Sequence, residues 1–359
     1  MTTYVLRRLL VSLPVIFGIL VAVFVITRIL PGDPCRALLG EKATEAACAA
    51  FNSRYGFDQP MFVQFVRYLG QVLTGDLGES IRFGIPVTQL LLERLPTTVE
   101  LGLISLTIAS VAGILLGITS ATRRNSRTDV VTMIFANLGV SIPVFVLGLI
   151  FAFFFAIVLK GTPLALPPSG RYTAGVIPTE IAEAWGLAGL GGPLRVLLDF
   201  ISNMSIPNAI LTLRPDLLVD AISHLLLPAV ALATIPMAVI ARVTRSSLLD
   251  VLGTDYIRTA RAKGLSPREV VSKHALRNAL LPVVTVIGLS LGGLLSGAVL
   301  TETIFNFAGV GRTISEAITA RDYVVVQGFT VVVSVGYVVV NLLVDISYAY
   351  LDPRVRMES

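Results

Sequence analysis

The sequence predicts an all-α, polytopic membrane protein with six membrane-spanning helices. Of its 359 residues, 54% are hydrophobic and only 14% are charged, whereas a soluble domain usually carries about a quarter charged residues. Six apolar segments are long enough to cross a bilayer, which takes about 20 helical residues. The basic residues between these segments alternate in the way that orients a bundle of six spans. Together these observations indicate that lipid is the solvent of the chain.

Each expected span is a mostly apolar run that a helix can extend across the bilayer. The spans are Leu9–Leu30, Thr97–Ser120, Val130–Leu159, Leu225–Thr244, Leu281–Leu300 and Val324–Tyr348. The first span follows Arg7 and Arg8, a pattern that signal peptides share. Its apolar run is longer than a typical signal-peptide core, and no small-residue cleavage pattern precedes Pro31. We therefore expect a first helix that is retained.

The basic residues concentrate on one side of a six-span arrangement. They are Arg7, Arg8, Arg123, Arg124, Arg127, Arg245, Arg258, Arg261, Lys263, Arg268, Lys273, Arg277, Arg354 and Arg356. The long loops on the other side have nearly balanced charge. The positive-inside rule then places both termini and the 245–280 loop in the cytoplasm, with the spans in contact with membrane lipid. The net charge of +5 is not gathered into a basic patch with interleaved aromatic residues, which argues against a nucleic-acid partner.

The spacing of the spans divides the chain into two parts. Residues 1–95 hold the first span and a large extracytoplasmic loop, and residues 96–359 form a core of the remaining five spans. The core carries an extracytoplasmic insertion at residues 160–223 and a cytoplasmic loop at residues 245–281. This division is an expectation from hydropathy and charge.

One stretch of the insertion, residues 186–213, is apolar enough to raise the question of an additional span. It is interrupted by Gly191, Gly192 and Pro193 and also contains charged residues. An amphipathic or re-entrant piece on the outer surface fits this composition better than a seventh span.

The two cysteines, Cys35 and Cys48, both fall in the first outer loop. In an oxidising compartment they could form a disulfide that closes a small loop, and two free thiols are the alternative. There is no CxxC motif or Cys/His cluster, and His224 and His274 are far apart in sequence. We therefore expect no metal site.

The cytoplasmic loop contains the most informative motif. It reads TDYIRTARAKGLSPREVVSKHALRNALLP over residues 254–282. Residues 255–263 favour a helix, and Gly264 is well placed to end it. Ser266 then begins a second helix, with Pro267 at its first position and Glu269 three residues after the serine, as in a capping box. The sequence thus predicts a compact helix–glycine–helix elbow, which we call the elbow.

The elbow is predicted to have two different sides. The basic side carries Arg258, Arg261, Lys263 and Arg268. The other side carries the small apolar residues Ile257, Ala260, Ala262 and Leu265. Small residues allow a partner surface to approach closely. An ordinary positive-inside loop would explain the charge alone, but two capped helices in so short a loop favour a docking element.

The elbow resembles the EAA loop of bacterial ABC importer permeases, the element that docks on the ATPase subunit. Ala260 and Gly264 match the second Ala and the Gly of that motif, whereas Arg258 and Thr259 stand where it has an acidic residue and its first Ala. Both departures are similar to the dipeptide/oligopeptide/nickel branch of the family. The departures therefore select a branch and do not argue against the family.

Other motifs extend the resemblance over most of the chain. They are PGDP at 31–34, GDLG at 75–78, TETIFNFAGVGR at 301–312, NLLVD at 341–345 and LDPR at 351–354. Their order and spacing are similar to the first, B-type membrane subunit of dipeptide systems. The segment around residues 160–220 matches least.

The resemblance implies a type I ABC importer permease of the bacterial inner membrane that is not itself an enzyme. It implies a homologous second permease, two ATPase subunits that hold ATP and Mg, and an extracytoplasmic peptide-binding protein. The residues that would couple to the ATPases are Arg258, Ala260, Ala262, Lys263, Gly264, Leu265, Ser266 and Glu269. Dipeptides or short oligopeptides are the leading substrates, and nickel chelates or glutathione are the alternatives within the family.

The fifth span contains a run of small residues that suits either helix packing or the lining of a pathway. They are Gly288, Gly292, Gly293, Ser296 and Gly297. Close helix packing is the more common role of such residues in lipid, and the two roles are compatible. Gly113 and Gly117 in the second span are expected to serve packing alone.

Three acidic residues lie in or near spans. Glu302, at the outer end of the fifth span, is a candidate for gating or for meeting the binding protein. Glu100 is expected to be an interfacial charge. Asp345 lies near the inner end of the sixth span and is expected to be solvated or paired.

No motif for catalysis is present. The sequence contains neither GxxxxGK[ST] for binding ATP phosphates nor HExxH. A secondary transporter driven by an ion gradient is a rival hypothesis, but it would need acidic or histidine relays in mid-membrane. An intramembrane enzyme is a further rival that lacks visible catalytic groups. A conduit driven by partners and without a cofactor of its own fits the sequence best.

Overall fold

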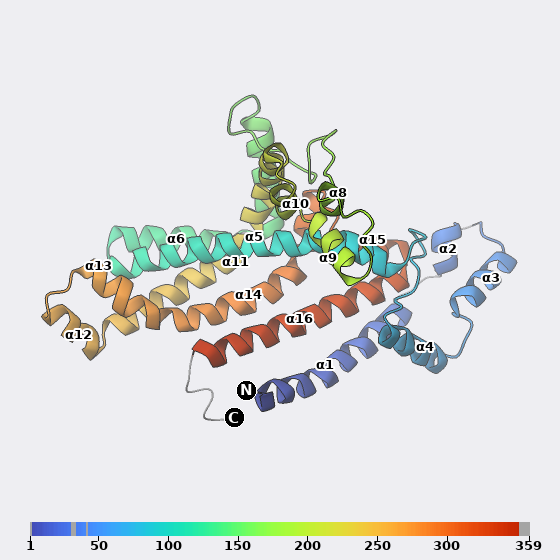
Figure 1. The fold of residues 1–359 in the computed structure, drawn as a ribbon, viewed down its shortest axis with the longest axis horizontal. Helices are drawn as coiled ribbons and strands as arrows, with labels where there is room; N and C mark the ends of the chain where they lie inside the picture. Colours follow the sequence, from blue (N-terminus) through green and yellow to red (C-terminus); the bar gives the residue numbers. More distant parts are fainter. Residues whose placement is uncertain (1, 30–33, 41, 352–359) are drawn as a thin grey trace.

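The computed structural model describes residues 2–29, 34–40 and 42–351, and the regular elements among them are helices. The helices gather into an elongated bundle, with short helices at one end and against its middle, and the elbow at the other end (Figure 1). The predicted all-α class is confirmed.

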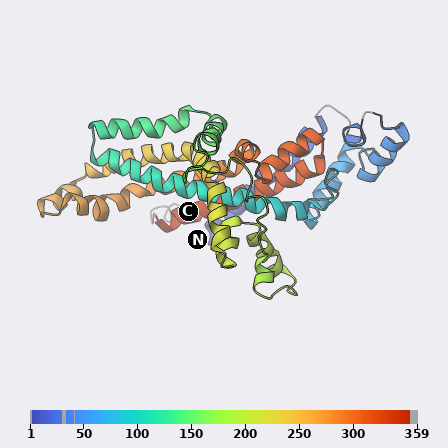
Figure 2. The ribbon, with the colours of Figure 1, turned by 90° about the horizontal axis from the view of Figure 1, so that it is seen from above.

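Five long helices run along the molecule and form the bundle (Figures 1 and 2). They are α1 (Thr2–Ile29), α5 (Val87–Thr122), α11 (Pro215–Leu252), α14 (Leu276–Ile304) and α16 (Tyr323–Leu351). Each contains a stretch long and apolar enough to cross a membrane. Helix α11 packs between α5 and α14 at the centre, and α1 packs on α16 at the periphery.

The core lies where α5, α11 and α14 meet. Leu101, Leu225, Leu294 and Phe305 are buried together there, and the area that they remove from solvent favours the packed bundle. Much of the outer surface of the bundle is apolar, which suits contact with lipid rather than with water.

Gly113 and Gly117 allow α5 and α11 to approach closely. A Cβ at Gly117 would lie 2.5 Å from Thr244 Cβ and 2.7 Å from the Ala241 carbonyl oxygen, and a Cβ at Gly113 would lie 2.8 Å from the Met237 carbonyl oxygen. These contacts agree with the predicted packing role of both glycines.

The third predicted span, Val130–Leu159, is not one straight helix. Helix α6 (Arg127–Ser141) and the following pair, α7 (Val144–Phe153) and the π-helix η1 (Phe154–Val158), meet at an angle of 101°. Pro143 stands at the break. A proline lacks the amide hydrogen that a continuous helix needs and disfavours helical backbone in the residue before it, here Ile142, whose ψ is 125°. Within the described residues the chain has five candidate spans, or six if this bent pair counts as one.

Short helices, which we call the cap, lie away from the elbow, some at the opposite end of the molecule and others against the middle of its length (Figure 1). They are α2 (Pro34–Leu39), α3 (Glu45–Tyr55), α4 (Met61–Thr74), α8 (Ile181–Ala184), α9 (Pro193–Ser202), α10 (Ser205–Leu211) and α15 (Val310–Ala320). The stretch 186–213 thus contributes short helices, and none of them is a candidate span. Helix α9 is amphipathic, with Leu198 buried and Leu194 and Leu197 exposed.

The elbow lies at the other end of the bundle (Figure 1). It consists of α12 (Asp255–Ala262), α13 (Pro267–Glu269) and the π-helix η2 (Val270–Ala275), which continues directly into α14. The start of α1 and the end of α16 point toward this same end (Figures 1 and 2).

Candidate functional site

The elbow has the local geometry that its sequence predicts. Helix α12 ends at Ala262, and Gly264 follows with a φ of +80°, a left-handed conformation that glycine adopts without strain. Ser266 Oγ then accepts a hydrogen bond from the amide of Glu269 at 3.3 Å and donates one to Glu269 Oε2 at 3.0 Å. The capping pair and the glycine together fix the angle between the two helices.

The apolar side of the elbow faces its own chain rather than a partner. Ile257 is fully buried and Ala260 nearly so, in a cluster with Leu248 of α11 and Ala275 and Ala279 of the segment that leads into α14. This corrects the prediction that Ile257 and Ala260 offer a surface to another protein. The physical reason is that a short helix needs its own buried face to remain folded. Ala260 therefore anchors the elbow.

The other predicted coupling residues lie on or near the surface. Five of them are exposed, namely Arg258, Ala262, Lys263, Gly264 and Ser266. The two that are half-buried are Leu265 and Glu269. An ion pair joins Arg258 to Asp255 at 3.2 Å, and another joins Lys273 to Glu269 at 3.4 Å. The exposed face of the elbow is thus a basic helix surface held in place by the buried face beneath it.

An ion pair with a buried carboxylate joins α6 to α11, the helix that precedes the elbow. Arg245 of α11 donates two hydrogen bonds to the Asp129 carboxylate, at 2.9 Å and 2.8 Å. Asp129 also accepts from Ser120 Oγ of α5 and from the Asn125 amide. Three helices are joined through this one carboxylate, which is only 4% exposed. From the sequence, Arg245 is only a loop charge, because its partner Asp129 is distant in the chain.

The small residues of α14 meet α16 at two positions. A Cβ at Gly288 would lie 2.5 Å from Val344 Cγ2, and Gly292 packs against the Tyr337 ring with no room for a side chain. Gly293 has open space beside it. Gly288 and Gly292 therefore serve close packing, whereas the role of Gly293 as a pathway residue stays a prediction. The side chains of Ser296, Gly297 and Asp345, and residues 31–33 of the PGDP motif, lie outside what the structure describes.

Glu302 is fully buried near the C-terminal end of α14, away from the elbow. Its Oε1 accepts a hydrogen bond from Thr98 Oγ1 at 2.5 Å, and its Oε2 accepts one from the Arg312 amide at 2.9 Å. The Thr98 hydroxyl in turn accepts from the Val310 amide at 2.8 Å. Glu302 thus caps the start of α15 and ties α5, α14 and α15 together. Its predicted part in gating or in meeting a binding protein stays a prediction.

Glu100 has a similar role. This corrects the prediction from the sequence that Glu100 is an interfacial charge. It is 4% exposed, and its carboxylate accepts hydrogen bonds from the Ser205 and Ile206 amides, at 2.8 Å and 2.7 Å. Both amides belong to the first turn of α10, whose amides have no partner within the helix. A helix start from the insertion is therefore anchored on a buried acid of α5.

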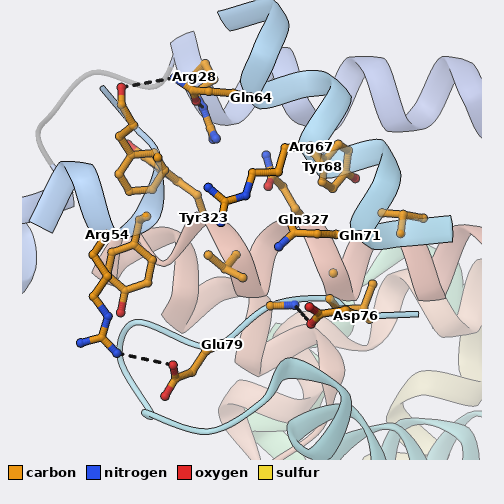
Figure 3. Close-up of a pocket in the computed structure, with 18 residues that line it drawn as sticks. Arg28, Arg54, Gln64, Arg67, Tyr68, Gln71, Asp76, Glu79, Tyr323 and Gln327 are labelled. Atoms are coloured by element: carbon orange, nitrogen blue, oxygen red, sulfur yellow. Dashed lines mark hydrogen bonds and ion pairs between the residues drawn. The ribbon is translucent and has the colours of Figure 1, made fainter. Parts of the chain in front are cut away.

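A polar cavity of about 220 Å³ lies in the cap, between α1, α3, α4 and α16 (Figure 3). Arg28 stands 4.8 Å from the centre of the Phe24 ring and 5.1 Å from that of Phe57, and its Nε donates to Gln64 Oε1 at 2.8 Å. Burial raises the pKa of Tyr68, also in the lining, to about 12. The cavity was not predictable from the sequence, because its lining residues come from four helices, of which α16 is far from the others in the chain, and from the loops beside them.

Cys35 and Cys48 are joined as a disulfide between α2 and α3, with their Cα atoms 5.4 Å apart. Elsewhere in the described ranges, no three His, Cys, Asp or Glu side chains gather as a metal site would require. Whether the cysteines are oxidised in the cell stays a prediction.

Comparison with known proteins extends these observations. A family model described as "Binding-protein-dependent transport system inner membrane component" matches residues 113–357, and its N-terminal counterpart matches residues 1–102. The dipeptide transport system permease protein DppB of Alkalihalophilus pseudofirmus is 41% identical over 99% of this chain and 100% of its own length. The di/tripeptide transport system permease protein DppB of Pseudomonas aeruginosa is 40% identical over 99% of both chains. The oligopeptide transport system permease protein AppB of Bacillus subtilis is 38% identical over 99% of this chain and all of its own.

A lipid-facing helical bundle with an anchored elbow defines a multi-span membrane permease. The matched residues identify it more closely: the chain belongs to the family of binding-protein-dependent transport system inner membrane components, the membrane subunits of ABC transporters. Such a subunit works within a transporter complex, and ATP hydrolysis is the task of separate subunits.

Proposed function

We propose that this chain is one of two permease subunits of an importer that carries dipeptides or short oligopeptides across the bacterial inner membrane. The peptide substrate is supported by relatives that are named for dipeptides, di/tripeptides and oligopeptides and match nearly the whole chain. An extracytoplasmic binding protein would deliver the peptide to the capped end. Two ATPase subunits, with ATP and Mg, would act at the elbow.

The observation that carries the mechanism is the double attachment of the elbow. Its exposed face is free to contact another chain, while Ile257 and Ala260 pack against both α11 and the start of α14. A displacement of α12 therefore moves two central helices of the bundle. Closure of the ATPases on binding ATP would pull the elbows and open the pathway outward, and hydrolysis would reset it.

The orientation belongs to the same proposal. With the elbow in the cytoplasm, both termini face the same compartment, in keeping with the basic residues near them. The cap of α2–α4, α8–α10 and α15 then faces outward, where a binding protein would dock.

Replacement of Gly264 tests the coupling role. A valine at a φ of +80° is strained by roughly 1–2 kcal/mol or more, although open space surrounds the position. We expect Gly264→Val to reduce ATP-driven uptake of a labelled dipeptide at least tenfold in proteoliposomes that contain all subunits. ATP hydrolysis by the partner subunits should persist.

Gly264→Asn is the matched control, because asparagine tolerates the left-handed conformation far better than valine. It should retain most of the uptake. Normal uptake by the valine variant would contradict the coupling role. Uptake of nickel chelates or glutathione in preference to dipeptides would redirect the substrate proposal.

A further inference from the structure

An amphiphilic cavity of about 750 Å³ lies behind the elbow, where α5 and α11 end. Thr122 and Leu252, the last residues of these two helices, both line it. Both helices are candidate membrane spans, and their ends mark the edge of the apolar bundle. The cavity therefore sits at the depth of the lipid headgroups on the side of the elbow.

The floor of the cavity is apolar. It is lined by Ile118 from α5, Leu249 from α11, Val271 from η2 of the elbow and Leu276 at the start of α14, and each of these side chains is partly exposed. A half-exposed floor of aliphatic side chains is a favourable surface for hydrocarbon and an unfavourable one for water.

Three arginines complete the lining: Arg124, Arg261 and Arg268. None of the described lining residues is Asp or Glu. All three arginines are exposed, and within the described part of the chain their guanidinium groups have no hydrogen bond or ion pair. Three guanidinium groups thus surround an aliphatic floor without a carboxylate to balance them.

Three neighbouring cations on this end of the molecule do have acidic partners. Arg245 is bound to Asp129, Arg258 to Asp255 and Lys273 to Glu269. Acidic residues are therefore present nearby, but they are paired elsewhere.

We propose that this cavity binds one anionic phospholipid of the leaflet in contact with the elbow. An acyl chain would occupy the aliphatic floor, and the phosphate would contact Arg124, Arg261 and Arg268. Basic pockets between spanning helices bind anionic headgroups in this way, and arginine is the side chain best suited to phosphate. Because Arg261 and Arg268 belong to the elbow and Arg124 follows α5, the lipid would connect the elbow to α5.

Native mass spectrometry of the purified full-length chain tests the proposal. The probes are phosphatidylglycerol and phosphatidylcholine with identical acyl chains. We expect phosphatidylglycerol to be retained in preference to phosphatidylcholine. The triple variant Arg124→Gln, Arg261→Gln, Arg268→Gln should weaken phosphatidylglycerol retention roughly a hundredfold, since each arginine near an anionic lipid contributes about fivefold. All three side chains are exposed, so the fold should survive.

A second triple variant, Arg123→Gln, Arg258→Gln, Lys273→Gln, is the matched control. It removes the same charge from the same end of the molecule and leaves the cavity lining intact. It should retain phosphatidylglycerol as the wild type does. Equal losses in the two triple variants would show attraction by net charge alone and would overturn the site.

Two further measurements separate the lipid from other occupants. Val271→Trp fills the floor without changing charge and should weaken retention, whereas competition by glycerol phosphate as strong as that by the lipid would assign the site to a free anion. In the assembled complex in nanodiscs, loss of the bound lipid would assign the cavity to the ATPase contact. Lipid binding is measured without transport, so it stands or falls separately from the proposed peptide import.

Discussion

Glu302 joins three helices from a position that solvent does not reach. Its two oxygens serve the Thr98 hydroxyl and the Arg312 amide, and Gly309 passes so close to the carboxylate that any side chain there would clash. The loss of a buried acceptor of this kind is costly, because its hydrogen-bond donors have no water molecule to take its place.

Glu302→Gln should therefore destabilise the chain although it preserves the shape of the side chain. The amide group replaces one acceptor oxygen by a donor that faces another donor, which costs about 1–3 kcal/mol. We expect the purified variant to have a lower thermal midpoint than the wild type, measured by size-exclusion chromatography of heated samples. Glu316→Gln on the surface of α15 should have a much smaller effect, since its ion pairs with Arg82 and Arg312 are partly exposed. Equal midpoints for both variants would refute the structural role of Glu302.

The cysteine pair gives a second prediction at this scale. Maleimide should label the wild-type chain only after reduction, because Cys35 and Cys48 are joined. Cys35→Ser should leave the partly exposed Cys48 reactive and should destabilise the link between α2 and α3 by roughly 3 kcal/mol, as expected for a short closed loop. Labelling that is independent of reductant would show free thiols instead.

Residue roles were predictable where they depend on neighbours in the chain. Gly264, Ser266 and Glu269 act through hydrogen bonds and backbone angles within a few residues, and local rules were enough to assign them. Asp129 and Glu302 act through partners that only the fold brings near. From the sequence, Glu302 is only a candidate for gating or for meeting a binding protein, and no local pattern indicates the contacts that either residue makes.

At the scale of elements, the contact between α5 and α11 depends on two glycines. Gly117→Ala should force the helices apart, since the added methyl group meets both Thr244 and the Ala241 carbonyl. We expect a loss of about 1–3 kcal/mol in stability, measured as a lower thermal midpoint. Gly293→Ala on α14 is the control: open space surrounds it, and alanine should stabilise the helix by about 0.5–1 kcal/mol. A neutral Gly117→Ala would contradict this packing.

The break between α6 and α7 shows what a local rule leaves undetermined. Pro143 made a bend possible, and hydropathy nevertheless favoured one continuous span. The direction of the bend depends on distant contacts: Gly139 packs against Thr234 of α11, and Gly148 packs against Phe305. These contacts bring together segments that are far apart in the sequence, so they could not be anticipated from it.

At the scale of the whole molecule, the two ends should face different compartments. A cysteine introduced at Lys273, on the elbow, should react with a membrane-impermeant maleimide only after the cells are permeabilised. A cysteine at Leu164, in the insertion, should react in intact cells. The two wild-type side chains are similarly exposed, at 69% and 66%, so accessibility to solvent does not bias the comparison. The reverse pattern would invert the proposed orientation.

The π-helix η2 has a mechanical consequence for transport. A π-turn contains one residue more than an α-turn, so its conversion into α-helix would rotate the faces of α14 by about 100°. Leu291 would then replace Gly292 opposite Tyr337, and Ile287 would replace Gly288 opposite Val344, where no side chain fits. Rotation of α14 alone is therefore blocked. Under the proposed coupling, force applied at the elbow would instead tilt or translate α14 together with α16.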